Sequence, residues 1–368
     1  MTQTAPSKEL FLDISVIIPV YNAAAYLHQC LSSIVRSFVD VEILCINDGS
    51  TDKSLAIMRA AATHDERITV IDKPNEGYGA TLNKGIAEAH GKYIAILEPD
   101  DYLEGDMFSS LFGLAEREGF PDVVKSAYQS IGNANDDQGA HCGYWKRIKP
   151  PNQPFCIEDA PLLLRYHPSI WSAIYRRDFL VENGIRFKEV PGAGWVDNPF
   201  LMETLLKAKS ISYTDNSFYR YRDEREGSSS SSLGDFRIPL DRWNEMTDTV
   251  EQLNIQNATI LGIQAYRAFY YLKEAHRATN FDEKGWLDEA KRIMRRLKPE
   301  IIAQSPFVSP RDRALYKQLT GAHLKNPSNI PYYNMVVREA FWKVRQNGIG
   351  FLIKSMSRRN EANRKQRS

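Results

Sequence analysis

The chain has few cysteines, and their arrangement suggests neither a metal site nor a disulfide framework. Its 368 residues include four cysteines, none in a Cys-x-x-Cys pair. Zinc sites and disulfide-rich folds need clustered or regularly spaced cysteines. Scattered cysteines are typical of a reducing compartment, so we expect a cytoplasmic protein. The seven histidines also lack metal-ligand spacing, and we assign them no role.

Long apolar runs are missing too. No stretch approaches the roughly 18 consecutive apolar residues that a membrane-spanning helix needs, so we expect no such helix. The first nine residues lack the basic-then-apolar order of a signal peptide. If this protein meets a membrane, we therefore expect it to lie on the inner face of the cell membrane as a peripheral protein.

Net charge is almost absent from the whole chain but not from its end. The formal net charge is +1. The segment from Arg338 to Ser368 holds nine Lys and Arg residues against two Glu, a balance of +7, which leaves −6 for residues 1–337. A basic tail on a mildly acidic body indicates an anionic partner, such as a membrane surface. We expect no nucleic-acid partner.

The basic tail, residues 336–368, has apolar side chains at helical spacing. Val337, Phe341 and Val344 fall at positions i, i+4 and i+7, with basic residues off that stripe. A basic amphipathic helix of this kind is typical of membrane interfaces. The alternative is a helix that packs on the protein's own C-terminal domain. The sequence leaves both open.

Short β-branched runs alternate with helical patterns over the first hundred residues. The spacing predicts strand–helix–strand units and therefore a parallel sheet, an α/β fold. Ligands of such sheets bind at the carboxyl ends of the strands. The predicted strands are Ile14–Val20, Val41–Ile46, Ile68–Ile71 and Tyr93–Leu97; the helices between them are Ala24–Val35, Asp52–Thr63 and Ala80–His90.

The pattern changes after about residue 222. The serine-rich stretch Glu226–Gly234 predicts a flexible loop, and Ile260–Lys273 and Trp286–Leu297 predict helices. Further strands are expected near Val123–Ser126 and Ile211–Tyr213. We therefore predict a flexible N-terminus over 1–9, an α/β domain over 10–230, a helical domain over 231–335 and the tail over 336–368.

Two strand ends carry polar loops on the same edge of the predicted sheet. The first strand ends in Pro19-Val20-Tyr21-Asn22, and the second in Asn47-Asp48-Gly49-Ser50-Thr51-Asp52. Asp48 supplies a carboxylate beside a glycine that lets the backbone approach a ligand. Two well-capped turns without a ligand are an equally open interpretation. A third motif, Asn75–Gly79 with Asn83-Lys84-Gly85, lacks the order of a dinucleotide or Walker loop.

The most informative motif is Glu98-Pro99-Asp100-Asp101, directly after the fourth strand. Three carboxylates this close repel one another unless a cation neutralises them. Mg²⁺ and Mn²⁺ prefer oxygen ligands and often bridge substrate phosphates. The alternative is that Asp100 and Asp101 cap the N-terminus of the next helix.

Taken in order, these motifs resemble the family 2 glycosyltransferases of the GT-A fold. The resemblance covers residues 13–130 well and continues more loosely to about 222. It implies a Rossmann-related, mostly parallel sheet flanked by helices, followed by a mostly helical C-terminal region. It also implies a nucleotide-sugar donor and a divalent metal. The residues that it assigns to the donor nucleotide are Pro19, Val20, Tyr21, Asn22, Asp48, Gly77, Asn83, Glu98 and Asp100.

Within the acidic motif, the resemblance implies that Glu98 faces the ribose, Asp100 holds the metal and Asp101 supports it. Glu98 and Asn47 stand where relatives usually have aspartate, and the longer Glu98 puts the metal geometry in question. Leu82 stands where many relatives have an arginine, which puts one base or phosphate contact in question.

A later segment resembles the family's acceptor side, from Ile170 to Leu180 and again from Gly194 to Phe200. Asp197 aligns with the catalytic base of inverting members; it could instead cap the helix Asn198–Lys207. Trp195 is a candidate for stacking on a sugar ring, or a core residue. Arg220 and Arg222 are candidates for the diphosphate or acceptor, or a solvated charged face.

The sequence therefore predicts transfer of a sugar, with inversion, from a nucleoside diphosphate donor, a UDP-sugar by preference. The expected acceptor is a hydroxyl of a polysaccharide or lipid-linked saccharide, and the expected cofactor is Mn²⁺ or Mg²⁺. Two alternatives stay open. A sugar nucleotidyltransferase uses a similar sheet, and a catalytically inactive GT-A-like scaffold would explain Glu98 and Asn47.

Overall fold

The computed structural model describes residues 12–34, 38–132, 139–223 and 234–346. The chain forms two compact units, one of residues 1–233 and 244–254, the other of residues 234–243 and 255–368. Helix α7 (Arg237–Gln252) has residues in both units. Most of the serine-rich stretch 226–234 lies outside the described residues. The bounds of the four predicted segments stay predictions.

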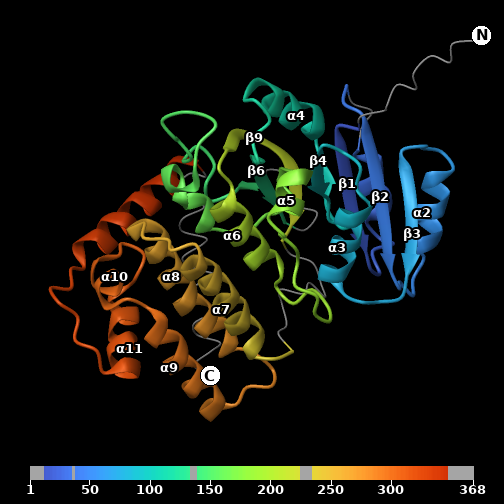
Figure 1. The fold of residues 1–368 in the computed structure, drawn as a ribbon. Coiled ribbons are helices and arrows are strands. Elements are labelled where there is room, and N and C mark those ends of the chain that lie inside the picture. Colours follow the sequence, from blue (N-terminus) through green and yellow to red (C-terminus); the bar gives the residue numbers. More distant parts are fainter. Residues whose placement is uncertain (1–11, 35–37, 133–138, 224–233, 347–368) are drawn as a thin grey trace, which may run out of the picture. The chain divides into compact units, whose positions relative to one another are not determined.

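Four parallel strands form one side of the sheet in the first unit, in the order β3-β2-β1-β4. Figure 1 shows β1, β2 and β3 side by side, with α2 beside β3. Every residue of β1 is buried, as expected of a strand covered on both faces. The predicted parallel strands are thus confirmed. Their bounds are β1 Ile14–Val20, β2 Val41–Asp48, β3 Ile68–Lys73 and β4 Tyr93–Ile96.

The other side of the sheet is mixed. β4 pairs with β8 antiparallel, β8 with β6 antiparallel, and β6 with β9 parallel. Strands β6 and β9 are longer than the short runs that were predicted near residues 123 and 211. The remaining strands are β5 Tyr102–Leu103, β6 Val123–Ile131, β7 Ala140–His141, β8 Ala173–Arg176 and β9 Ile211–Arg222.

The helices of the first unit follow the predicted pattern, with one clear difference. The first helix was predicted from Ala24, but α1 begins at Leu27. The backbone N–H groups of Ala23 and Ala24 donate instead to Ser54 and Asp52 side chains, which hold this turn outside the helix. The bounds are α1 Leu27–Ser32, α2 Ser54–Ala62, α3 Tyr78–Glu88, α4 Met107–Arg117, α5 Arg177–Glu182 and α6 Asp197–Lys207, with 3₁₀ turns at Ile157–Asp159 and Pro161–Leu164.

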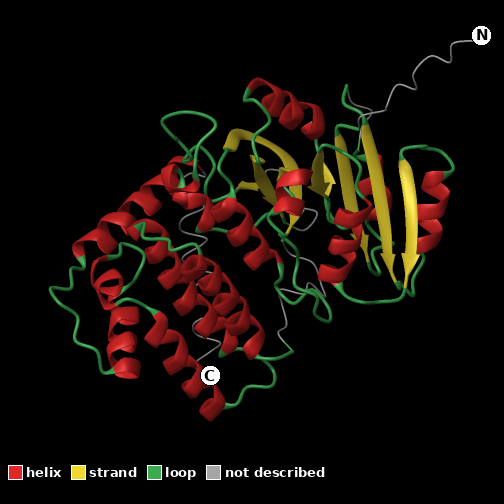
Figure 2. Cartoon of the chain, in the orientation of Figure 1, coloured by secondary structure: helices red, strands yellow, loops and turns green. Residues whose placement is uncertain are grey.

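The second unit is built from helices (Figure 2). Side-chain caps start three of them, from Asn257, Asp282 and Ser309, and satisfy N–H groups of the first turn. Within the described ranges, no helix is both long and apolar enough to cross a bilayer. The helices are α8 Ala258–Ala275, α9 Glu283–Arg296, α10 Pro299–Gln304 and α11 Pro310–Thr320, and residues 330–346 are also helical.

Candidate active site

Asn22 locks the first strand-end loop to the second. Its side-chain oxygen accepts hydrogen bonds from the N–H groups of Thr51 (2.8 Å) and Asp52 (3.3 Å), and its own N–H donates to Ser50 Oγ (3.0 Å). Asn22 adopts a left-handed backbone (φ 49°), which asparagine tolerates better than most residues. The neighbouring Tyr21 is 53% exposed. Of the four residues predicted for this loop, Tyr21 therefore offers the free ring face, while buried Pro19 and Val20 complete β1.

Asp48 organises the loop after β3. Its carboxylate pairs with Lys73 and accepts hydrogen bonds from the N–H groups of Glu76 (2.9 Å) and Gly77 (3.0 Å). Burial alone would raise the pKa of Asp48, but these hydrogen bonds and the Lys73 charge hold it below its usual value. The structure thus gives Asp48 a positioning role; its predicted nucleotide contact stays a prediction.

The two unusual residues have structural explanations. Asn47 donates its side-chain N–H to Asp72 Oδ1 (2.8 Å), whereas an aspartate here would face another carboxylate. Leu82 is fully buried on α3. An arginine at this position would have to leave the core, because burying an unpaired charge is costly.

The glycines of the third motif admit another backbone segment rather than cradling a phosphate. A Cβ on Gly77 would lie 2.5 Å from the carbonyl oxygen of Val190, and one on Gly79 would collide with that of Lys188. The N–H of Tyr78 donates to the carbonyl of Gly192 (3.0 Å). The start of α3 is therefore bound closely to residues 188–192, the segment that leads to Asp197.

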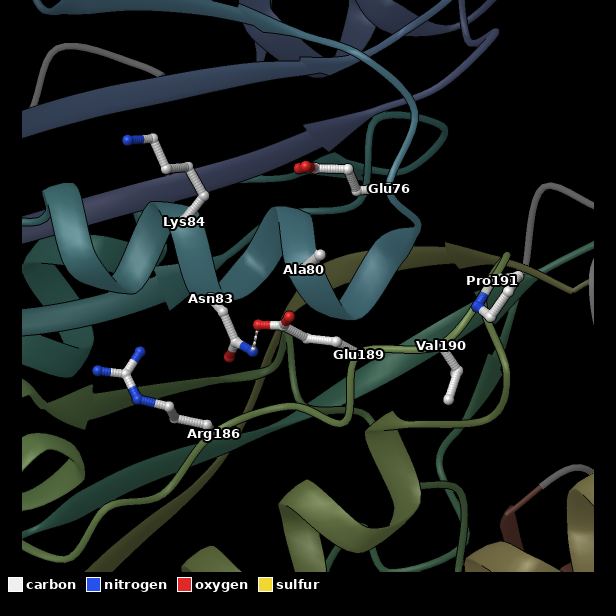
Figure 3. Close-up of a pocket in the computed structure, with 8 residues that line it drawn as sticks. All are labelled: Glu76, Ala80, Asn83, Lys84, Arg186, Glu189, Val190 and Pro191. Carbon is white, nitrogen blue, oxygen red and sulfur yellow. Dashed lines mark hydrogen bonds between the residues drawn. The ribbon is translucent and has the colours of Figure 1, made fainter.

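Asn83 supports the same segment from the middle of α3 (Figure 3). Its amide donates to the carbonyl of Phe187 and to Glu189 Oε1, both at 2.9 Å, and its oxygen accepts the N–H of Phe187 at 2.9 Å. These contacts engage both ends of the amide, so the assignment of Asn83 to the donor stays a prediction. A cavity of about 550 Å³ adjoins them, lined by Glu76, Ala80, Asn83, Lys84, Arg186, Glu189, Val190 and Pro191.

The acidic motif does not cap a helix. It is followed by β5, and helix α4 begins only at Met107, where Asp106 accepts the N–H of Ser109 (3.0 Å). The capping interpretation of Asp100 and Asp101 is therefore wrong. The three acids sit in a loop at the carboxyl end of β4, where parallel sheets bind ligands.

Asp101 is the buried anchor of this loop. One carboxylate oxygen accepts from the Tyr219 hydroxyl (2.9 Å), and the other accepts from the N–H of Arg222 (2.8 Å). Burial, with the charge of Asp100, raises the pKa of Asp101 well above its usual value. The guanidinium of Arg222 also donates to the carbonyl of Asp100 (2.5 Å). Arg222 thus braces the acidic loop, whereas Arg220 pairs with Glu104.

Glu98 lies within electrostatic reach of Asp197. Its carboxylate accepts the hydroxyl of Tyr78, and burial raises its pKa well above the usual value, helped by the charges of Asp100, Asp101 and Asp197. Side chains from β4's end and from α6 therefore share one electrostatic environment. Accumulated negative charge of this kind favours a bound cation. In the part of the chain that the structure describes, no three His, Cys, Asp or Glu side chains form a preformed metal cluster.

Asp197 is the first residue of α6. Its Oδ1 accepts two hydrogen bonds from Asn198, from the backbone N–H and the side-chain amide, both at 3.0 Å. The N-cap position belongs to Val196, whose side chain makes no capping bond. Trp195 has a left-handed backbone (φ 57°), which is strained for a bulky residue and common beside functional sites.

Sequence reasoning missed the tyrosines of this site. Tyr78 contacts Glu98, and Tyr219 contacts both Asp101 and the N–H of Glu98 (3.1 Å). Tyr219 and Tyr221 alternate with Arg220 and Arg222 along β9, so a strict two-residue period could have placed the tyrosines on the face of Asp101. The prediction for this basic-aromatic run named Arg220 and Arg222 as its candidate site residues.

Comparison with known proteins agrees with this architecture. The family model for glycosyl transferase family 2 matches residues 15–180. An uncharacterised glycosyltransferase of Bacillus subtilis, EpsJ, is 29% identical over 217 residues, 57% of this chain and 61% of the relative. A poly(ribitol-phosphate) beta-glucosyltransferase of Bacillus spizizenii is 29% identical over 221 residues, 59% of this chain and 33% of the relative. The match thus spans less than two thirds of either relative.

A solved structure shows the same fold. The crystal structure of S. aureus TarS 1-349 in complex with UDP-GlcNAc superposes with a TM-score of 0.70 and 19% identity, covering 89% of this chain and 92% of that one. The predicted GT-A-like fold, with its helical C-terminal region, is thereby confirmed. The family match over residues 15–180 also confirms the predicted resemblance to the family 2 glycosyltransferases.

Proposed function

We propose that this protein transfers a sugar, with inversion, from a UDP-linked donor to a hydroxyl of a polysaccharide or lipid-linked saccharide. The observation that carries the proposal is that Glu98 and Asp100, at the carboxyl end of the parallel strand β4, share an electrostatic environment with Asp197 at the start of α6. Such a group of acids suits a reaction in which one carboxylate removes a proton and others manage the charge of a diphosphate.

On the donor side, Tyr21 and the loop that Asp48 organises would hold the nucleotide. Tyr21 is exposed beside a loop fixed by Asn22, so its ring is free to stack on a base. Gly77, the residue before α3, lies buried where its N–H meets Asp48. Loops at adjacent strand ends thus form one edge of the site.

The residues fit a divalent cation in part. Glu98 and Asp100 would hold Mn²⁺ or Mg²⁺, whereas Asp101 already accepts a protein hydrogen bond on each oxygen. The metal would neutralise the diphosphate on which charge builds as the glycosidic bond breaks. Burial raises the pKa of Glu98, so a bound cation would favour its ionised form.

Asp197 would act as the general base. A sugar hydroxyl is a weak nucleophile until its proton is removed. In the proposed step, Asp197 takes that proton while the acceptor oxygen bonds to the anomeric carbon, and the donor diphosphate leaves from the opposite face with the bonding electrons. Attack opposite to the leaving group gives inversion. The two bonds from Asn198 would orient the carboxylate.

The helix at residues 330–346 supports an anionic membrane surface as a further partner. Ile330, Val337 and Phe341 on it are 69%, 67% and 71% exposed. This exposure favours the membrane alternative over a stripe covered by the protein's own domain. The basic residues from 347 onward lie outside the described residues.

Donor hydrolysis tests the proposal. Purified protein is incubated with UDP-sugars and GDP-sugars, with Mn²⁺ or with chelator, and the released nucleotide is measured. Metal-dependent release of UDP from at least one UDP-sugar is expected. Pyrophosphate release from UTP and a sugar 1-phosphate would instead identify a sugar nucleotidyltransferase. The absence of both reactions, together with no binding of UDP by calorimetry, would identify an inactive scaffold.

A further inference from the structure

A row of aromatic rings leads from the acidic loop to the surface. Tyr219, whose hydroxyl holds Asp101, stacks on Trp171 with ring centroids 3.9 Å apart and planes 19° apart. Trp171 stacks in turn on Tyr221 at 5.1 Å and 21°. The ring of His167 lies 5.1 Å from that of Tyr221. The row is therefore Tyr219, Trp171, Tyr221 and His167.

Exposure rises along this aromatic row. Tyr219 is fully buried and Trp171 is 4% exposed, while Tyr221 is half-buried and His167 is exposed. Tyr221 also lies within electrostatic reach of Asp197: burial raises its pKa most, and Asp101, Asp100 and Asp197 raise it further. Stacking through Trp171 thus connects Tyr221 to Tyr219, the tyrosine that holds the acidic loop.

A buried lysine fixes the outer end of the row. Lys125 Nζ donates to the carbonyl of Ser169 (2.7 Å) and to the hydroxyls of Ser169 and Ser172 (3.0 Å each). Ser169 has a left-handed backbone (φ 39°), and its N–H donates to Nδ1 of His167 (3.1 Å). Because Lys125 is fully buried, its three bonds hold this strained turn in place. His167 and Trp171 flank that turn.

We propose that Tyr221 and His167 form the acceptor subsite and bind a pyranose ring through its apolar face. This inference rests on the proposed function and names the acceptor side of that site. Aromatic rings present flat apolar area with polar edges, which suits a sugar ring whose hydroxyls reach neighbouring carboxylates. A stack on Tyr221 would bring such hydroxyls toward Asp197. The donor base has a separate candidate in Tyr21, on the β1 loop.

Ligand binding by saturation-transfer NMR tests the subsite. The probes are methyl glycosides of glucose, galactose and N-acetylglucosamine, added to the full-length protein with saturating UDP and Mn²⁺; sorbitol serves as an open-chain polyol control. The variants are Tyr221→Ala, Tyr221→Phe and His167→Ala. Tyr270→Ala removes an exposed aromatic from the second unit and is the matched control. UDP affinity is measured in parallel by calorimetry.

We expect at least one pyranoside, but not sorbitol, to receive saturation. Its affinity should fall about three- to tenfold in Tyr221→Ala and His167→Ala, and stay near wild type in Tyr221→Phe and Tyr270→Ala. UDP affinity should be unchanged throughout. His167 is exposed, so its alanine variant tests the subsite even if Tyr221→Ala is unstable.

The subsite is overturned if no pyranoside exceeds sorbitol, or if both alanine variants bind it like wild type. Loss of UDP affinity in Tyr221→Ala would indicate that Tyr221 contacts the nucleotide, and it would also overturn the proposed acceptor subsite. Failure of the proposed function looks different: wild type would then neither bind UDP nor hydrolyse a UDP-sugar, whatever the pyranosides do.

Discussion

The carboxylates of this site differ in their hydrogen-bond partners, even where they are neighbours in the sequence. Asp101 is bound on both oxygens by Tyr219 and Arg222, so it shapes the acidic loop. Asp48 does the same for the loop after β3. Asp197 begins α6 and accepts two hydrogen bonds from the adjacent Asn198. The proposed chemistry is assigned to Asp100 and Asp197.

Replacing Asp197 separates catalysis from donor binding. If it is the general base, Asp197→Asn should lower kcat by about 10²–10⁴ with little change in donor affinity. The amide keeps the shape of the side chain and can still accept the N–H of Asn198. Steady-state kinetics, UDP calorimetry and the melting temperature are compared with wild type. Near-normal turnover with a lower melting temperature would give Asp197 a structural role instead.

Asp100 and Asp101 should respond differently to substitution. Asp100→Ala should abolish metal-dependent donor hydrolysis and shift the free energy of unfolding by no more than about 0.5 kcal/mol. Asp101→Asn should cost about 1–3 kcal/mol of that free energy, because an amide cannot accept both the Tyr219 and Arg222 bonds. Denaturant unfolding and hydrolysis assays check both. Normal hydrolysis by Asp100→Ala would contradict the metal assignment.

At the scale of elements, contacts between distant loops position the site. The β1 and β2 loops interlock through Asn22, and the start of α3 is held to residues 188–192 through Gly77, Gly79 and Asn83. The contacts of α3 connect the loop after β3 with the segment before Asp197. A substitution that moves one of these loops should therefore also shift the loops that it contacts.

Asp48→Ala should loosen the loop after β3. It leaves the buried N–H of Gly77 and the ammonium of Lys73 without their acceptor, so we expect a loss of about 1–3 kcal/mol in unfolding free energy and weaker UDP binding. Because the folded pKa lies below the usual value, this contribution is complete at pH 7 and is lost as the pH falls through the folded pKa. Calorimetry with UDP and unfolding at pH 7 and pH 3 measure both effects. Unchanged UDP affinity would exclude Asp48 from the donor site.

Because Lys125 is buried, the free energy of unfolding should increase between neutral and mildly alkaline pH. Burial lowers the pKa of Lys125 to about 7, whereas the unfolded chain keeps this lysine protonated up to about pH 10. The unfolded state thus binds more protons between these values, and the free energy of unfolding should rise by about 2 kcal/mol from pH 7 to pH 9. Lys125→Met should lack that rise in denaturant titrations at the two pH values. An equal rise in the variant would show that other groups cause it.

At the scale of the whole molecule, the tail should govern membrane attachment and leave the first unit's chemistry alone. Deletion of residues 336–368 should release the protein from anionic vesicles and spare donor hydrolysis. Each basic residue near such a surface is worth about 1 kcal/mol, and salt should weaken the attraction. Co-sedimentation with anionic and neutral vesicles at low and high salt measures it. If the full-length protein does not co-sediment with anionic vesicles at low salt, the proposed membrane contact is wrong.

The sequence by itself determined the parallel half of the sheet and the order of its loops. Apolar β-branched runs such as Ile14–Val20 are typical of strands that are covered on both faces. The acidic motif directly follows one of these strands in the sequence. The short spacing between strands then required right-handed crossovers, which put the polar loops on one edge. Local patterns were enough because the formation of strands and helices depends mainly on nearby residues.

Only the tertiary structure showed which side chains hold the loops of the site in place. Asn83 meets Glu189 106 positions away, and Tyr219 meets Asp101 118 positions away. No periodicity reveals such pairs, because a hydrogen bond depends on where packing leaves two atoms within about 3 Å. The same packing excluded the capping role of Asp100, since β5 follows it, and brought His167 into the aromatic row. Long-range packing, not local pattern, therefore determines which carboxylates are held by hydrogen bonds from distant residues.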